Sequence, residues 1–297
     1  MSGPRSPAAQ GILLMIAAIF MFSVMDVAAK AIAARADTVM ALWARYAGQT
    51  LIVAALVLPR LHIVARTRYP GLQALRSFLL LAASTMMFFG IATMGLTEVT
   101  AIMAMNPVLI TLGAAVLLRE GLGLRRVLGI GAALIGALII IRPGTEVFSL
   151  NALLPLGAAV SFAGYALTTR FVGRDEDPWT SLLYTGLLGA IVLSVAVPFF
   201  WVPPDATTVL LLIAIGAVGG LGQLLLIRAL SVAQAGIVAP FSYSGILFAT
   251  IWGMLLFGEY PDALTLLGAL VIVGAGLYVW QRETRLRAAR PPLNEAA

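Results

Sequence analysis

The sequence contains no cysteine, one histidine and one lysine, and only 11% of its residues are charged. Without cysteine, disulfide bonds, thiol catalysis and thiolate metal sites are excluded. The one histidine, His62, lies in a basic loop, which excludes a histidine-based catalytic triad in the membrane and an HExxH metal site. The sequence therefore predicts a protein that is not an enzyme and that has no metal site and no cofactor.

The scarcity of charge also excludes a soluble fold, because soluble domains carry charge on about a quarter of their residues. Of the 297 residues, 61% are hydrophobic, and the mean hydropathy is +1.01. The formal net charge is +6, but the basic residues are spread between apolar runs rather than gathered on one face. This pattern indicates contact with membrane lipid and no nucleic-acid partner.

Ten apolar runs are long enough to cross the hydrocarbon core of a bilayer as helices, which takes about 20 residues. They show no strand-like alternation, so we expect an all-α membrane protein that forms a single membrane domain over residues 1–297. Residues 281–297 are expected to form a basic cytoplasmic tail. The predicted spans are Gln10–Ala33, Thr38–Leu58, Leu72–Met94, Thr97–Leu118, Leu124–Ile141, Leu150–Thr169, Trp179–Phe200, Thr207–Ile227, Ala233–Phe257 and Ala263–Trp280.

The distribution of basic residues predicts the orientation of these spans. With a cytoplasmic N-terminus, fifteen Lys and Arg residues fall on the inner side and four on the outer side. Because cytoplasmic loops are enriched in Lys and Arg, both termini are expected in the cytoplasm, with the protein in a bacterial inner membrane. The first run lacks a small-residue cleavage site, so we expect it to be retained as a span.

The two halves of the chain contain matching segments. Glu120 closes one span as Glu259 closes another, at a spacing of 139 residues, and "VLLREGLGLRRVLGIGAALIGALII" resembles "LLFGEYPDALTLLGALVIVGAGLYV". "AAIFMFSVMDVAAK" aligns in the same way with "AAVSFAGYALTTR", which places Lys30 over Arg170. We therefore predict two five-helix repeats, over residues 10–142 and 150–280.

Because each repeat has an odd number of spans, the second repeat has the opposite orientation in the membrane to the first. Inverted repeats of this kind hold a substrate near the midplane and open alternately to the two sides of the membrane. The predicted fold is thus ten transmembrane helices in two inverted repeats, and the predicted mechanism is alternating access.

These segments resemble the drug/metabolite transporter superfamily, in its ten-helix EamA-type branch. The resemblance rests on "NPVLITLGAAVLLRE" with its glycine-rich follower and on the matching "LLFGE". It implies a monomeric secondary transporter of a small molecule, here an exporter of aromatic or large apolar amino acids. A multidrug or other metabolite carrier of this fold is the alternative, and a channel or a lipid-moving protein is a more distant one.

Two charges lie within the first span, at Asp26 and Lys30. At positions i and i+4 of a helix they can neutralise each other on one face. One interpretation is that both residues have a gating or proton-coupling role, with Arg170 as the counterpart of Lys30. The other is that Lys30 reaches the lipid headgroups and Asp26 only partners it.

The resemblance implies a cavity walled by the first, third, fourth, sixth, eighth and ninth spans. Polar and aromatic residues at helical spacing on these spans are the candidate substrate-binding residues, although hydrogen bonds between helices or core packing would explain them too. Arg45, in the second span, is expected to reach the outer headgroups rather than to bind a carboxylate. The candidates are Tyr243, Ser244, Asn106, Tyr165, Gln223, Phe248, Trp252 and Met86.

Overall fold

The computed structural model describes residues 7–117, 124–142, 150–172, 176–232 and 239–288, and within these ranges it contains helices and no strand. The elements are α1 (Pro7–Ala33), α2 (Thr38–Val57), η1 (Leu58–Arg60), α3 (Leu61–Val64), α4 (Pro70–Thr93), α5 (Leu96–Met103), α6 (Asn106–Leu117), α7 (Leu124–Ile141), η2 (Leu150–Ala152), α8 (Leu153–Val172), α9 (Pro178–Ala196), η3 (Val197–Phe200), α10 (Ala206–Val232), η4 (Ala239–Tyr243), α12 (Ser244–Trp252), η5 (Gly253–Phe257) and α13 (Ala263–Ala288).

Six stretches of helix are long and apolar enough to cross a membrane, which confirms the prediction of an all-helical membrane protein. The remaining four predicted spans fall on shorter apolar helices, so the count of ten spans stays a prediction. The six long stretches are Ala9–Ala33, Thr38–Val64, Pro70–Thr93, Leu150–Thr169, Pro178–Phe200 and Ala206–Ala229, and the shorter ones are Leu96–Ile110, Gly131–Ile141, Phe241–Phe257 and Ala263–Tyr278.

The outer surface of the bundle is apolar. Large hydrophobic side chains such as Leu51 on α2, Leu210 on α10 and Leu270 on α13 are about 70% exposed. In water such a surface would drive aggregation, whereas in a bilayer the lipid tails cover it. The structure thus agrees with an integral membrane protein.

Two of the predicted spans are interrupted helices. The fourth is split, because α5 ends at Met103 and α6 begins only at Asn106, next to Pro107, which has no N–H to donate. The described part of the ninth, from Ala239 onward, consists of the 3₁₀ segment η4, then α12 and then the π-helical η5. The last span, by contrast, is longer than predicted: α13 continues past Trp280 to Ala288.

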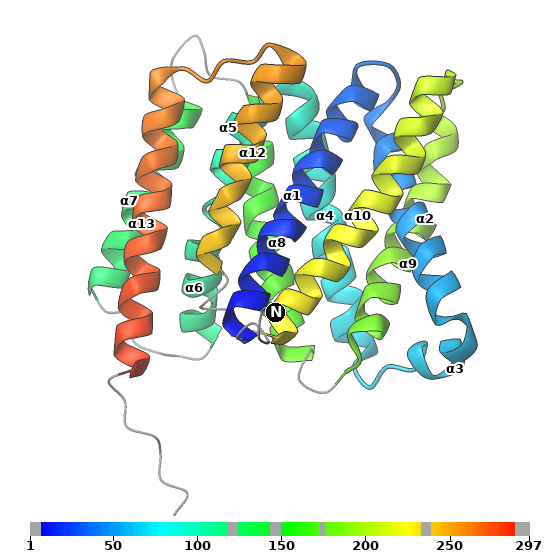
Figure 1. Cartoon of the computed structure of the whole chain (residues 1–297), viewed down its shortest axis with the longest axis horizontal. Coiled ribbons are helices and arrows are strands. Elements are labelled where there is room, and N and C mark those ends of the chain that lie inside the picture. The colour runs from blue at the N-terminus through cyan, green and yellow to red at the C-terminus, as the bar shows by residue number, and fades with distance from the viewer. Residues whose placement is uncertain (1–6, 118–123, 143–149, 173–175, 233–238, 289–297) are drawn as a thin grey trace, which may run out of the picture.

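The helices pair across the two halves of the chain (Figure 1). The most extensive pairings join α1 with α10, α4 with α8, α7 with α13, and α2 with α10 and α9. α2 and α10 touch backbone to backbone, since a Cβ atom on Gly48 would lie 2.7 Å from Gly216 Cα. Figure 1 also shows that α1 begins and α13 ends at the same edge of the bundle.

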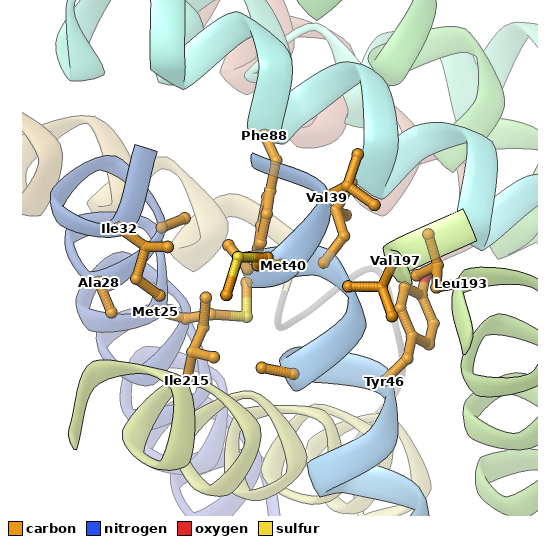
Figure 2. Packing of buried hydrophobic residues seen from close by; sticks show 14 of the residues in the cluster. Met25, Ala28, Ile32, Val39, Met40, Tyr46, Phe88, Leu193, Val197 and Ile215 are labelled. Carbon is orange, nitrogen blue, oxygen red and sulfur yellow. The ribbon is translucent and has the colours of Figure 1, made fainter. Parts of the chain in front are cut away.

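The largest apolar cluster lies around α2 (Figure 2). Met40 and Tyr46 of α2 are fully buried there, between Ile32 of α1, Phe88 of α4 and Ile215 of α10. This packing fixes the position of Arg45, the residue before Tyr46, among α1, α4 and α10.

Candidate functional site

An ion pair connects helix ends at one end of the bundle. Lys30, in the last turn of α1, places its Nζ 2.5 Å from Oε1 of Glu259. The same Nζ donates hydrogen bonds to the carbonyl oxygens of Ile91, at 3.2 Å, and Met94, at 2.6 Å, where α4 ends. A cation is favourable at this place because the last carbonyls of a helix carry partial negative charge.

The turn before Glu259 directs the Glu259 side chain back toward the bundle. Gly258 ends η5 in the left-handed region, with φ of 65°, and the N–H of Glu259 donates to the carbonyl of Gly253 at 3.0 Å. This is the bonding of a glycine-terminated helix. Oε2 of Glu259 then accepts the N–H of Leu96 at 2.9 Å, at the start of α5. The carboxylate thus joins the end of α1 to the start of α5, and Lys30 links both to the end of α4.

Asp26 lies one turn before Lys30 but does not pair with it. Lys30 pairs with Glu259 instead, and within the described part of the chain Asp26 takes part in no ion pair. The predicted mutual neutralisation of Asp26 and Lys30 is therefore wrong, because the reach of Lys30 to the α4 carbonyls carries its Nζ away from Asp26.

Arg45 is buried inside the bundle rather than extended to the headgroups, and only 4% of it is exposed. Its guanidinium donates to the hydroxyl of Ser84 on α4, and it stacks on the rings of Tyr46, at 4.9 Å, and Phe88, at 5.8 Å. Tyr46 also donates to Ser84, at 3.0 Å. The prediction that Arg45 reaches the headgroups is wrong, since the aromatic rings of the core hold it.

Two predicted site residues meet at a second buried arginine. Gln223 of α10 donates to the hydroxyl of Tyr165 of α8 at 2.9 Å, and Arg76 of α4 donates to the same hydroxyl at 3.2 Å. Arg76 further donates to Thr169 at 2.7 Å and to the carbonyl of Ser181 at 3.1 Å. This network fastens α8, α9 and α10 to α4.

Aromatic side chains link α1 to α12. The ring of Phe20 lies 5.4 Å from that of Phe248 and 6.1 Å from that of Trp252, between ring centroids. The indole N–H of Trp252 donates to Ser23 at 3.1 Å. The predicted residues Phe248 and Trp252 thus contact the helix that carries Asp26 and Lys30.

The other predicted site residues lie apart from these contacts. Tyr243 places its hydroxyl against Gly276 of α13, and Ser244 donates to the carbonyl of Phe241 within its own helical turn. Asn106 holds a buried Oδ1 that accepts no hydrogen bond from a described residue. Met86 packs against Gly157 of α8. The side chain of Arg170 lies outside the described residues, so its gating role stays a prediction.

Glu176, in the connection from α8 to α9, holds the start of α4 from outside the membrane-spanning helices. It accepts hydrogen bonds from Thr67, from the backbone N–H of Arg68 at 2.6 Å and from Gln73. Burial by itself would raise the pKa of Glu176, but these hydrogen bonds stabilise the carboxylate and leave its pKa below the ordinary value.

Glu259 and Arg76 were not among the residues that the sequence singled out, and Arg45 was assigned to the lipid headgroups rather than to a site. Glu259 served only as a marker of the repeat, because a glutamate at a span end is not unusual. The two arginines each lie inside a predicted span, and an ionisable residue within a span is by itself a signal of function. That signal was available in the sequence.

An all-helical bundle with an apolar surface, charged residues in its interior and an ion pair across one end is the architecture of a membrane transport protein. A comparison with family models agrees. The chain belongs to the EamA-like transporter family, whose model matches residues 9–142 and again residues 150–280.

Curated relatives of this chain are named as transporters. It is 31% identical over 244 residues to a riboflavin transporter of Vibrio cholerae, covering 80% of this chain and 82% of that protein. It is 32% identical to the pseudopaline exporter CntI of Pseudomonas aeruginosa, covering 89% and 94%. It is 23% identical to an S-adenosylmethionine uptake transporter of Rickettsia prowazekii, covering 94% and 95%.

A solved structure titled "Crystal structure of protein" shares the fold, with a TM-score of 0.66, 18% identity and coverage of 94% of this chain and 99% of that one. The resemblance to the drug/metabolite transporter superfamily is confirmed. The chain is a metabolite transporter and not an enzyme.

Proposed function

We propose that this protein is a secondary transporter that exports amino acids with aromatic or large apolar side chains across the inner membrane by alternating access. The observation that carries the proposal is the Lys30–Glu259 ion pair, which joins three helix ends at one edge of the bundle. Phe22, Asp26 and Lys30 form one stripe on α1 and are half-buried. Such a pair can close one mouth of a path that passes Asp26.

The packing supports the two inverted repeats, at residues 10–142 and 150–280, on which alternating access depends. The first helix of each half packs on the third long helix of the other: α1 on α10, and α8 on α4. The interruption after Ala104 in the fourth span lies 139 residues before the junction of η4 and α12 at Tyr243. The double match of the family model adds to this support.

The aromatic contacts between α1 and α12 support the substrate class. Phe20, Phe248 and Trp252 present ring surfaces beside the stripe on α1, with Ser23 as a polar neighbour. Aromatic surfaces of this kind favour a guest with an aromatic or large apolar body. The remaining predicted residues, Tyr243, Ser244, Asn106, Tyr165, Gln223 and Met86, belong to this proposal as lining positions.

The proposed arrangement is a monomer with both termini in the cytoplasm. The common edge at which α1 begins and α13 ends supports the placement of both ends on one side, and the distribution of arginines supports the cytoplasmic side. The Lys30–Glu259 pair then closes the outer mouth.

A second candidate substrate is riboflavin, which the names of relatives from Vibrio cholerae and Brucella anthropi favour. Riboflavin also carries a large aromatic ring system. It differs from an amino acid because it has no carboxylate and no ammonium group.

Uptake into liposomes that contain the purified protein tests the proposal. The labelled compounds are L-phenylalanine, L-tryptophan, L-leucine and riboflavin, each measured with and without a pH gradient. We expect uptake of the amino acids above that of empty liposomes. Riboflavin uptake alone would favour the second candidate, and no uptake of any compound would contradict the transporter proposal for both.

A further inference from the structure

Two arginines lie inside the bundle in very different surroundings. Arg76 is fully buried and donates hydrogen bonds from Nε and from both terminal nitrogens, to Thr169, Gln73, Ser181 and Tyr165. Arg45 is equally enclosed, but its Nε is buried without a hydrogen-bond partner among the described residues. Every nitrogen of the Arg76 guanidinium thus donates to the protein, whereas in Arg45 one terminal nitrogen donates to Ser84 and the Nε–H stays unused.

Arg45 also lacks a paired anion. Within the described ranges it takes part in no ion pair. The rings of Tyr46 and Phe88 stabilise the cation in part. An unpaired donor on a buried charge is nevertheless costly, and apolar residues at this place would avoid that cost.

Asp26 lies on an enclosed part of α1, close to the helix contact that holds Arg45. Every residue of α1 from Leu14 to Ala33 is buried or half-buried, because neighbouring helices surround this part of α1. Asp26 is half-buried there. Its neighbour Met25 and Arg45 of α2 both lie against Gly219 of α10, because a Cβ atom on that glycine would lie 3.0 Å from Met25 Sδ and 3.5 Å from Arg45 Cγ. The acidic and the basic side chain therefore come from neighbouring positions in the bundle but form no ion pair with each other in the described part of the chain.

We propose that Arg45 binds the carboxylate of a zwitterionic substrate through its free Nε–H, and that Asp26 accepts the substrate's ammonium group. This inference rests on the proposed transport function and specifies its substrate: a zwitterion with an aromatic or apolar body, rather than a neutral ring compound. A carboxylate suits the site because guanidinium N–H groups bind its two oxygens in parallel. The rings of Tyr46 and Phe88 and the hydroxyl of Ser84 hold the guanidinium in place for this contact.

Two matched variants separate a ligand-binding arginine from a structural one. Arg76→Met removes hydrogen bonds that join α4 to α8 and α9, so we expect its midpoint of thermal unfolding in detergent to fall by several degrees. Arg45→Met removes one hydrogen bond, to Ser84, and replaces the contacts of the guanidinium with the rings of Tyr46 and Phe88 by contacts that a methionine can also make. We therefore expect its midpoint to stay close to that of the wild type. Equal losses in the two variants would mean that Arg45 is structural and would overturn the inference.

Uptake into proteoliposomes gives the second readout, with labelled L-phenylalanine as the probe. We expect Arg45→Met to lower the uptake about tenfold or more, which corresponds to the loss of one charge-assisted contact. Arg66→Gln, which changes an exposed arginine, is the control and is expected to keep the uptake of the wild type. Excess unlabelled L-phenylalanine should compete with the probe, whereas L-phenylalaninamide and N-acetyl-L-phenylalanine, which each lack one of the two charges, should not.

The possible failures can be told apart. If L-phenylalaninamide or N-acetyl-L-phenylalanine inhibits uptake as strongly as free L-phenylalanine does, the zwitterion site is overturned. Uptake of riboflavin alone overturns it too. In both cases the transporter proposal still stands. No uptake of any compound by the wild type overturns the proposed function and this inference with it.

Discussion

Lys30 and Glu259 each make further contacts besides the ion pair that joins them. The ammonium lies on the carbonyls that end α4, and the carboxylate lies on the N–H that starts α5. The favourable interaction of each charged group with its helix end adds to the stabilisation that the ion pair provides. Because both residues are partly buried, the removal of one leaves the other poorly compensated.

Glu259→Gln is therefore expected to open this mouth more often. A cysteine placed at Phe22, two turns inside Lys30, would report the opening, because the chain has no cysteine of its own. We expect a membrane-impermeant maleimide added on the Glu259 side to label it about tenfold faster with Glu259→Gln, as a shift of about 1.4 kcal/mol would produce.

The control for this experiment is Asp262→Asn, which breaks the neighbouring pair of Asp262 with Arg142. Asp262 is half-exposed, and surface pairs contribute little. The labelling rate should not change with this variant. If Glu259→Gln left the rate unchanged too, the ion pair would not hold the mouth closed.

Glu176 is expected to make the stability of the protein depend on pH. Its folded pKa lies below the ordinary value of 4.5, so its stabilisation is complete above pH 4.5 and is lost as the pH falls through the folded pKa. Glu176→Gln should therefore cost about 1 kcal/mol at pH 7, a small figure because the residue is partly exposed. The cost should vanish at low pH.

Thermal unfolding of the wild type and of Glu176→Gln across this pH range measures the effect. A double variant with Thr67→Val provides the comparison, because a shared hydrogen bond makes the two changes less than additive. A constant difference between wild type and Glu176→Gln at all pH values would show that ionisation of Glu176 is not involved.

The sequence predicted some of these side chains better than others. Lys30 was singled out because a charge within an apolar run is visible in one segment, and Tyr165 and Gln223 because polar residues stand out in apolar helices. The partner of Lys30 could not be predicted, since Glu259 lies 229 positions away and reaches it through the Gly258 turn. Local spacing favoured Asp26 as the partner.

Among the helices, α2 and α10 depend most visibly on residues without side chains. Gly48 and Gly216 bring the two backbones together, and a Cβ atom on either would lie within 3 Å of the other's Cα. Contacts this close maximise van der Waals attraction in lipid, where no hydrophobic force drives helices together.

Gly48→Ala should thus lower the stability by about 1 to 3 kcal/mol, because the two helices must separate to admit the methyl group. Gly274→Ala on α13 is the matched control, since nothing lies within 4 Å of its added Cβ. Its midpoint of thermal unfolding should stay the same or rise, because alanine favours a helix. Equal effects of the two changes would contradict the close packing of α2 on α10.

The helices themselves were predicted well where an apolar run is long and is bounded by a capping residue. Asp37 accepts the N–H of Val39 and caps α2, which begins at Thr38 as predicted. The interruptions of the fourth and ninth spans were not predicted. Their hydropathy continues through the break, and only tertiary packing shows where the helix stops.

The complete chain should place its two halves in opposite orientations. In the proposed topology, single cysteines introduced next to Glu120 and next to Glu259 react with impermeant maleimide from opposite sides of the membrane. A cysteine at the C-terminus should react from the same side as the one next to Glu120. Labelling of the Glu120 and Glu259 positions from one side would contradict the inverted repeats, and with them the proposed alternating access.

The π-helical segment η5, at Gly253–Phe257, sets a constraint of another kind on the closed mouth. A π turn winds more residues into a turn than an α turn does, so η5 rotates all that follows it about the helix axis. Deleting one residue there would turn Glu259 by about 100° if α-helical winding returned, away from Lys30. The proposed closure by the Lys30–Glu259 pair therefore depends on the length of this segment more than on the identity of its exposed side chains.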